Sequence, residues 1–181
     1  DSLLARLATP PAVVEFLRRS LPADLDLQLD APSGDGGQTL KVDGQLGTAK
    51  TTLTATLSQG IARALTAPLK ASLDLTSESP QLMTRQLGLG DVPVLDPKTP
   101  LHLNVAIDGV PANSYATHVA LDGGDDRLVF DGNVVPGDFT RISGNGTLIA
   151  ALSDPSVLVG LLGGEGVYVP ALKGTAKLRF D

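Results

Sequence analysis

The stretch ASLDLTSESPQLMTRQLGLGDVPVLDPKTPLHL, residues 71–103, contains the pattern from which the rest of the chain is built. Its first residues alternate between aliphatic and polar, which is typical of a half-buried strand. Ser79 and Pro80 then provide an N-cap and a first-turn proline, and Gly88 is placed to end the helix that they start. Alternation resumes at Leu101, so the stretch predicts a strand, a short helix, a loop and a second strand. The apolar stripe of this helix is expected to consist of Leu82, Met83, Gln86 and Leu87.

The same order of elements recurs toward both ends of the chain. Residues 9–29 supply a helix and a following strand, and residues 147–178 supply a strand, a helix, a loop and a strand. The helix-starting prolines are Pro11, Pro80 and Pro155, which gives a repeat of roughly seventy residues, longer than common solenoid periods. We therefore interpret residues 1–181 as a single β-rich segment with unit one at 9–78, unit two at 79–153 and the start of unit three at 154–181.

Alternating segments fill most of the sequence outside these helices. Short turns separate them, which predicts an antiparallel meander with one apolar and one polar face on each strand. Such a sheet must hide its apolar face, so we expect it to curl into an open groove, with a β-sandwich as the alternative. The segments are 24–31, 40–46, 51–58, 67–75, 101–108, 115–121, 128–134, 139–152 and 172–180.

Composition excludes several classes of function. The net charge is −6, and basic residues do not cluster beyond Arg18 and Arg19, so the electrostatic footprint of a nucleic-acid-binding protein is missing. There is no cysteine, and aromatic residues make up only 3% of the chain, so leucine, valine and alanine must fill the core. No apolar run is long enough to span a bilayer, and the chain is expected to be a piece of a longer protein.

Catalytic and metal-binding patterns are poor. The chain contains neither G-x-S-x-G nor H-E-x-x-H. His102 and His118 alternate with apolar neighbours and are therefore expected on the polar face. Asp122, Asp125 and Asp126 lie in a glycine-rich hairpin, where carboxylates are usually solvated turn residues, although they could touch a calcium ion. We predict no enzymatic activity, no metal and no cofactor.

The aliphatic faces suggest a role in sheltering lipid. An acyl chain gains about 0.8 kcal/mol per buried methylene, so a sixteen-carbon tail sheltered on such a face could gain on the order of 12 kcal/mol before costs. Aliphatic walls without polar anchors suit sliding of a chain rather than tight, oriented binding. Periodicity alone favours the other interpretation, in which the same face packs a β-sandwich.

Four pieces of the sequence resemble bacterial AsmA-like proteins: SESPQLMTRQLGL, PLHLNVAIDG, LVFDGNV and GNGTLIAALSDP. The resemblance covers most of the chain from Thr9 onward and rests on structural patterns. It implies a protein akin to TamB-type proteins, tethered to the inner membrane with β-rich repeats in the periplasm. The implied function is outer-membrane homeostasis and movement of phospholipid between membranes along a hydrophobic groove. The chain departs from that family in lacking an N-terminal membrane helix, as expected for a fragment.

These observations lead to one set of candidate lipid-contacting residues. An open sheet also has unpaired edges, so edge-to-edge self-association is expected. The alternative is a structural or protein-binding β-module, such as a spacer, assembly or adhesin repeat, with no lipid role. The residues predicted to line the apolar groove are Leu27, Leu29, Leu53, Leu73, Leu103, Val105, Val119, Phe130 and Leu148.

Overall fold

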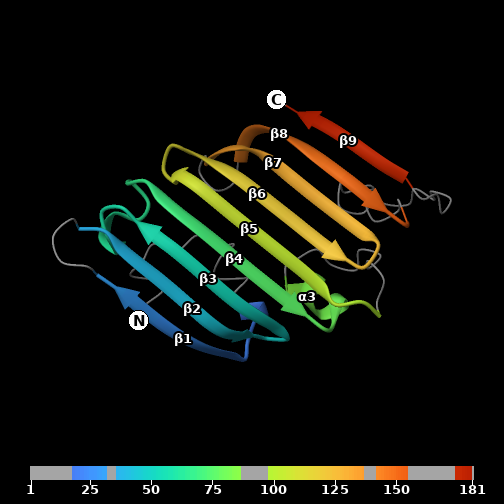
Figure 1. The fold of residues 1–181 in the computed structure, drawn as a ribbon, viewed down its shortest axis with the longest axis horizontal. Coiled ribbons are helices and arrows are strands. Elements are labelled where there is room, and N and C mark those ends of the chain that lie inside the picture. Colours follow the sequence, from blue (N-terminus) through green and yellow to red (C-terminus); the bar gives the residue numbers. More distant parts are fainter. Residues whose placement is uncertain (1–17, 32–35, 87–97, 137–141, 155–173, 181) are drawn as a thin grey trace.

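The protein folds as an open antiparallel sheet in which chain order and spatial order are the same. The computed structural model describes residues 18–31, 36–86, 98–136, 142–154 and 174–180. Within these residues all nine strands belong to one sheet in the order β1 to β9, each antiparallel to its neighbours (Figure 1). The predicted meander is therefore confirmed, and among the described residues it neither closes on itself nor forms a second sheet.

Each predicted strand is present, within a few residues of its expected ends. Period-2 alternation identifies strands well here because each strand has one apolar and one polar face. The strands are β1 Ala23–Asp30, β2 Gln38–Leu46, β3 Ala49–Leu57, β4 Leu69–Ser77, β5 Leu101–Val110, β6 Ser114–Gly123, β7 Asp126–Pro136, β8 Ile142–Leu152 and β9 Gly174–Phe180.

Tight turns join β2 to β3, β5 to β6 and β6 to β7. Gly47, between β2 and β3, has φ 59°, and Gly124, between β6 and β7, has φ 69°. Glycine adopts this left-handed conformation without the steric penalty that a side chain would impose. The amide of Gly47 also donates to the carbonyl of Pro22 at 2.9 Å, which ties the turn to the chain entering β1.

The helix α3, Pro80–Gln86, packs on the apolar face of the sheet. It begins at the predicted proline, and the amide of Met83 donates to the carbonyl of Ser79 at 3.1 Å in its first turn. Met83 is 1% exposed, but Leu82 is 44% exposed, so the prediction that Leu82 belongs to the buried stripe is wrong. The buried face instead contains Pro80, Met83 and Thr84, which lie at helical spacing.

The core lies between α3 and the adjoining ends of the central strands. Its members come from β3 to β8 and from α3 (Figure 1), and Leu101 is the most deeply buried of them, at 0% exposed. Leucine and alanine dominate it, as the shortage of aromatic residues requires. The buried cluster consists of Ala49, Leu75, Met83, Leu101, Leu103, Leu121, Leu128, Ala150 and Leu152.

The division into repeat units stays a prediction, and the described elements are distributed over the expected ranges as follows. Strands β1–β4 fall within 9–78, α3 and β5–β8 fall within 79–153, and β9 falls within 154–181. One 3-10 turn, η1 Ile61–Arg63, lies between β3 and β4 and was not predicted. Most of the helix predicted at 9–21, the end of α3 at Gly88 and the third helix after Pro155 lie outside the described residues.

Candidate functional site

The register of the sheet brings the predicted lining residues onto one face. Residues directly opposite each other on neighbouring strands share a face, and here the pairs connect into a row that crosses the sheet. The row also contains Val42, which was not among the predicted lining residues and which fills the place between Leu27 and Leu53. In order from β1 to β8, the row is Leu27, Val42, Leu53, Leu73, Val105, Val119, Phe130 and Leu148.

The two remaining candidates flank this row on the same face. Leu29 lies two residues after Leu27 on β1 and is paired with Leu40. Leu103 lies two residues before Val105 on β5 and is paired with Leu75 and Leu121. The structure therefore brings all the predicted lining residues onto one face of the sheet.

Burial differs along the row. Leu27 and Leu29 on β1 are 67% and 48% exposed, whereas Leu103 belongs to the buried cluster with Met83. The middle of the row is partly buried, and its Leu73, Val105 and Val119 pack against that cluster. The apolar face is therefore covered where it lies beside α3 and exposed at the β1 edge.

Phe130 is fitted into the row by two glycines. Gly132 on β7 is opposite Gly146 on β8, and a Cβ atom added to either would meet the Phe130 ring, with Cζ 2.6 Å from a Cβ on Gly132. The ring therefore occupies the space of the missing side chains and covers the backbone there. Aromatic residues that cover glycines in this way help to hold neighbouring strands in register.

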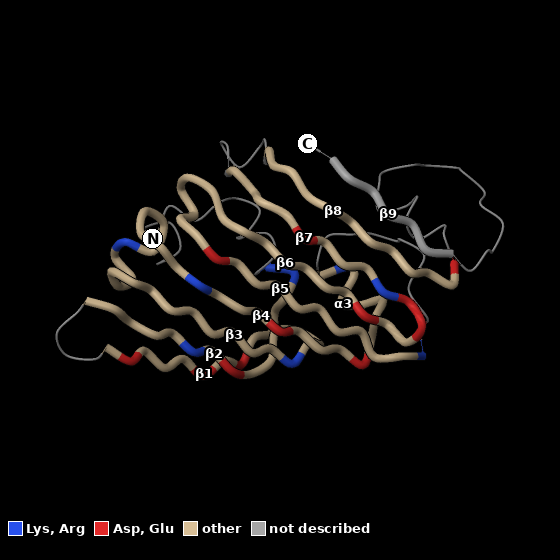
Figure 2. The backbone as a smooth tube through the Cα atoms, turned by 45° about the horizontal axis from the view of Figure 1, so that its top comes forward, with Lys and Arg blue, Asp and Glu red and all other residues tan. Residues whose placement is uncertain are grey.

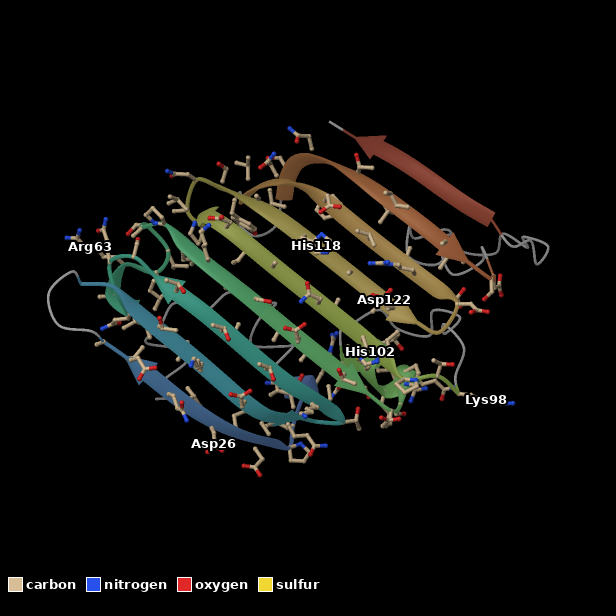
Figure 3. The ribbon with its side chains drawn as sticks, in the orientation of Figure 1. Asp26, Arg63, Lys98, His102, His118 and Asp122 are labelled. Carbon is tan, nitrogen blue, oxygen red and sulfur yellow. The ribbon has the colours of Figure 1, made fainter. Side chains whose placement is uncertain are left out.

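The opposite face of the sheet is polar. His102 and His118 both lie on it, as expected, together with Asp122 and Asp26 (Figure 3). Basic and acidic residues are interspersed over the described strands and turns rather than gathered into one basic patch (Figure 2). The sheet is therefore amphipathic, with hydroxyl, amide and charged groups on one side and aliphatic groups on the other.

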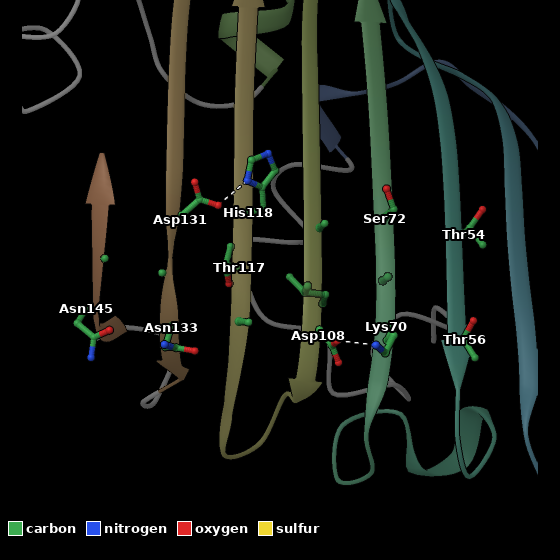
Figure 4. A pocket seen from close by; sticks show the side chains of 16 residues that line it. Thr54, Thr56, Lys70, Ser72, Asp108, Thr117, His118, Asp131, Asn133 and Asn145 are labelled. Atoms are coloured by element: carbon green, nitrogen blue, oxygen red, sulfur yellow. Dashed lines mark hydrogen bonds and ion pairs between the residues drawn. The ribbon is translucent and has the colours of Figure 1, made fainter. Parts of the chain in front are cut away.

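A hollow of about 780 Å³ lies on this polar face across β3 to β8 (Figure 4). Its floor is low because Ala106 and Ala116 carry small side chains, and the backbone of Gly132 and Gly146 also lines it. The hollow could not be predicted from the sequence, because these small residues lie on separate strands and only the register brings them together. Its polar walls include Thr54, Thr56, Lys70, Ser72, Asp108, His118, Asp131, Asn133 and Asn145.

One ion pair and one histidine–aspartate hydrogen bond lie in the walls of this hollow. Lys70 Nζ lies 2.7 Å from Asp108 Oδ2, and His118 Nδ1 lies 2.6 Å from Asp131 Oδ1. The hydrogen bond to Asp108, and then that carboxylate's negative charge, raises the pKa of Lys70 above 10.5. Both pairs join directly opposed residues on neighbouring strands, so they act as cross-strand links within the polar face.

Two of the three aspartates of the β6–β7 hairpin make local contacts, and Asp125 is exposed. Asp122 pairs with Arg127 Nε at 3.1 Å. Asp126 is 3% exposed, and its carboxylate accepts from both the backbone amide and the hydroxyl of Ser153. The expectation of solvated turn carboxylates is therefore wrong for Asp126, which links the hairpin to the end of β8. Among the described residues, no cluster of three or more histidine, aspartate or glutamate side chains is arranged to hold a metal ion.

Comparisons add no relative to this geometry. No protein-family model, no curated protein and no solved structure matches the chain. In the part of the chain that the structure describes, no helix combines the length and the apolar character needed to cross a membrane.

Proposed function

We propose that the apolar face of this sheet shelters acyl chains, as part of a bacterial envelope protein that moves phospholipid between the inner and outer membranes. The observation that carries the proposal is the row of apolar side chains from Leu27 to Leu148, which continues from strand to strand without a charged residue. Eight strands at a spacing of about 4.8 Å make this row about 34 Å long. The role is one of binding and conduction, not catalysis.

The distribution of polarity supports passage along the row rather than fixation at one point. Ion pairs such as Lys70–Asp108 lie on the other face, so a chain that follows the row meets no charge that would anchor it. Each methylene removed from water contributes about 0.8 kcal/mol wherever along the row it lies. Uniform shelter of this kind predicts that no single lining residue is indispensable.

The cellular setting follows from the resemblance to AsmA-like proteins. In the full-length protein, this segment would lie in the periplasm and be tethered to the inner membrane by parts outside residues 1–181. Contact with phospholipid would contribute to outer-membrane homeostasis. The competing function is structural, and the burial of Leu103 and Met83 within one cluster favours it, because that end of the face is already used for packing.

Photo-crosslinking in cells that produce the full-length protein tests the proposal. A photoreactive residue at Leu53, Val105 or Val119 should capture phospholipid, because these positions share the apolar row. Matched controls come from the next residue on the same strand, Thr54, Asn104 and His118, which face the other way and should capture little. Equal capture of lipid from both faces, or capture of protein alone, would contradict the proposal of lipid shelter and favour the structural function.

A further inference from the structure

The first strands of units one and two, β1 and β5, have the same sequence pattern but different surroundings. The two stretches are PADLDLQLD, residues 22–30, and PLHLNVAID, residues 100–108. Each begins with a proline and ends with an aspartate at the ninth position. Between these two residues, aliphatic side chains recur at every second position and so lie on one face. In the described residues, β5 lies between β4 and β6, whereas β1 is an edge strand paired with β2 alone. The contacts between β4 and β5 therefore indicate which kind of strand could pair with the outer edge of β1.

β4 matches β5 on both faces. On the polar face, Lys70 pairs with Asp108 at 2.7 Å, and Asn104 Nδ2 donates to Asp74 Oδ1 at 2.7 Å. On the apolar face, Val105 is directly opposite Leu73. The partner of β5 is thus an antiparallel strand with aliphatic residues on one face and a lysine that meets the terminal aspartate on the other.

The corresponding positions on β1 also favour a basic residue on the partner strand, and they carry more negative charge than those on β5. Asp30 corresponds to Asp108, and Asp26 corresponds to Asn104, so an incoming strand meets carboxylates at both positions. Asp26 and Asp30 are exposed, and Asp43, directly opposite Asp26 on β2, adds another negative charge. On the other face, Leu27 is 67% exposed at the point where Val105 meets its partner.

We propose that the edge of β1 binds an antiparallel strand of the β4 type, with aliphatic residues facing Leu27 and Leu29 and with lysine or arginine opposite Asp30 and Asp26. Backbone hydrogen bonds would provide much of the affinity, and the charges would set the register, as in other cases of strand addition. The inference concerns a polypeptide partner and stands whether or not the apolar face binds lipid.

A second copy of the chain does not meet this description. Its β4 lies inside the sheet with partners on both sides. Its β1 in an antiparallel pairing would bring two sets of aspartates together, and like charges on adjacent strands are unfavourable. Its β9 runs in the same direction as β1, because strands alternate in direction along the sheet, so a translated copy would meet β1 in parallel. The fitting partner is a separate extended segment with alternating aliphatic and basic residues.

The probe is a peptide with the sequence of residues 66–79, which includes β4, and with Asp74→Lys, so that a lysine lies opposite Asp26 as well as Asp30. Labelled at one end and titrated with the 181-residue protein, it should show saturable binding by fluorescence anisotropy. A peptide with Lys70→Glu should bind about 5–10-fold more weakly, because an attractive cross-strand pair becomes repulsive. The protein variant Asp30→Lys should restore binding of that altered peptide and weaken binding of the original one.

Two further variants fix the location of the site. Asp125→Lys makes the same change of charge in the exposed β6–β7 turn and should leave both affinities unchanged. Asp30→Asn should weaken binding of the original peptide, whereas Asp108→Asn should not. The proposal is overturned by absence of saturable binding, by equal affinity for both peptides, or by a loss in Asp108→Asn in place of Asp30→Asn, which would mean that the peptide replaces β4 inside the sheet.

Discussion

At the scale of single residues, the effect of a new charge on this sheet depends on which of its two faces the side chain occupies. Asn104 and Val105 are neighbours on β5, yet Asn104 donates to Asp74 on the polar face while Val105 packs against the buried cluster. A new charge should therefore be tolerated at one position and not at the other.

The matched pair Val105→Lys and Asn104→Lys tests this directly. Val105→Lys should lower the free energy of unfolding by about 2–4 kcal/mol, because it places an unpaired charge among aliphatic side chains. Asn104→Lys should change it by less than about 0.5 kcal/mol, because the ammonium can replace the amide as donor to Asp74. Urea unfolding followed by circular dichroism measures both, and equal losses would show that the faces are assigned wrongly.

Residue-scale properties could be predicted from sequence only where alternation decides them. The face occupied by each predicted lining residue follows from period 2, which also placed His102 and His118 on the polar side. The burial of Asp126 could not be predicted, because it depends on Ser153, which is distant in sequence and reaches the carboxylate only through the pairing of β7 and β8. The Phe130 ring over Gly132 and Gly146 has the same origin.

At the scale of elements, α3 shows how a two-turn helix is oriented. Its start could be predicted from Ser79 and Pro80, but its buried face could not, because seven residues contain too few turns to define an apolar stripe. Contact with the sheet determines which side of the helix is buried, and that side contains Met83. The side chain of Gln86 supports this docking by donating from Nε2 to the carbonyl of Leu46 at 3.2 Å.

Alanine substitutions in α3 provide a second prediction. Met83→Ala should destabilise the protein by about 2–5 kcal/mol, because it leaves a cavity in the buried cluster. Leu82→Ala, one position away on the exposed side, should change stability by less than about 0.5 kcal/mol. Thermal melts of the two variants compare them under identical conditions. A larger loss for Leu82→Ala would mean that the helix buries the predicted stripe after all.

At the scale of the whole molecule, the sheet has two faces and, among the described residues, two edges at β1 and β9. The order of strands could be predicted, because short turns between alternating segments leave a meander as the simplest arrangement. The hollow on the polar face could not, because a period of two assigns each residue to a face but does not say which residues on different strands are opposite each other. The turns at Gly47 and Gly124 constrain that register for β2 with β3 and for β6 with β7.

The free edges predict how the isolated chain behaves at high concentration. β1 and β9 are the edge strands of the described sheet, and unpaired backbone groups on an edge attract other strands. Pairing of two β1 strands about a twofold axis keeps both apolar faces on the same side but brings the exposed Asp26 and Asp30 of the two copies close together. Self-association should therefore be weak at low salt, appear toward millimolar concentration, and strengthen with added salt as repulsion is screened.

Sedimentation equilibrium from micromolar to millimolar protein, at about 0.01 M and 0.5 M salt, measures this behaviour. The double variant Asp26→Asn and Asp30→Asn should associate more strongly than the unaltered chain at low salt and should lose most of the salt dependence, because it removes charge from the β1 edge. The control Asp125→Asn removes a carboxylate from an exposed turn and should behave like the unaltered chain. A chain that remains monomeric at millimolar concentration would contradict open edges. Association that weakens with salt would instead indicate contact between edges of opposite charge, with β9 of one copy against β1 of the next.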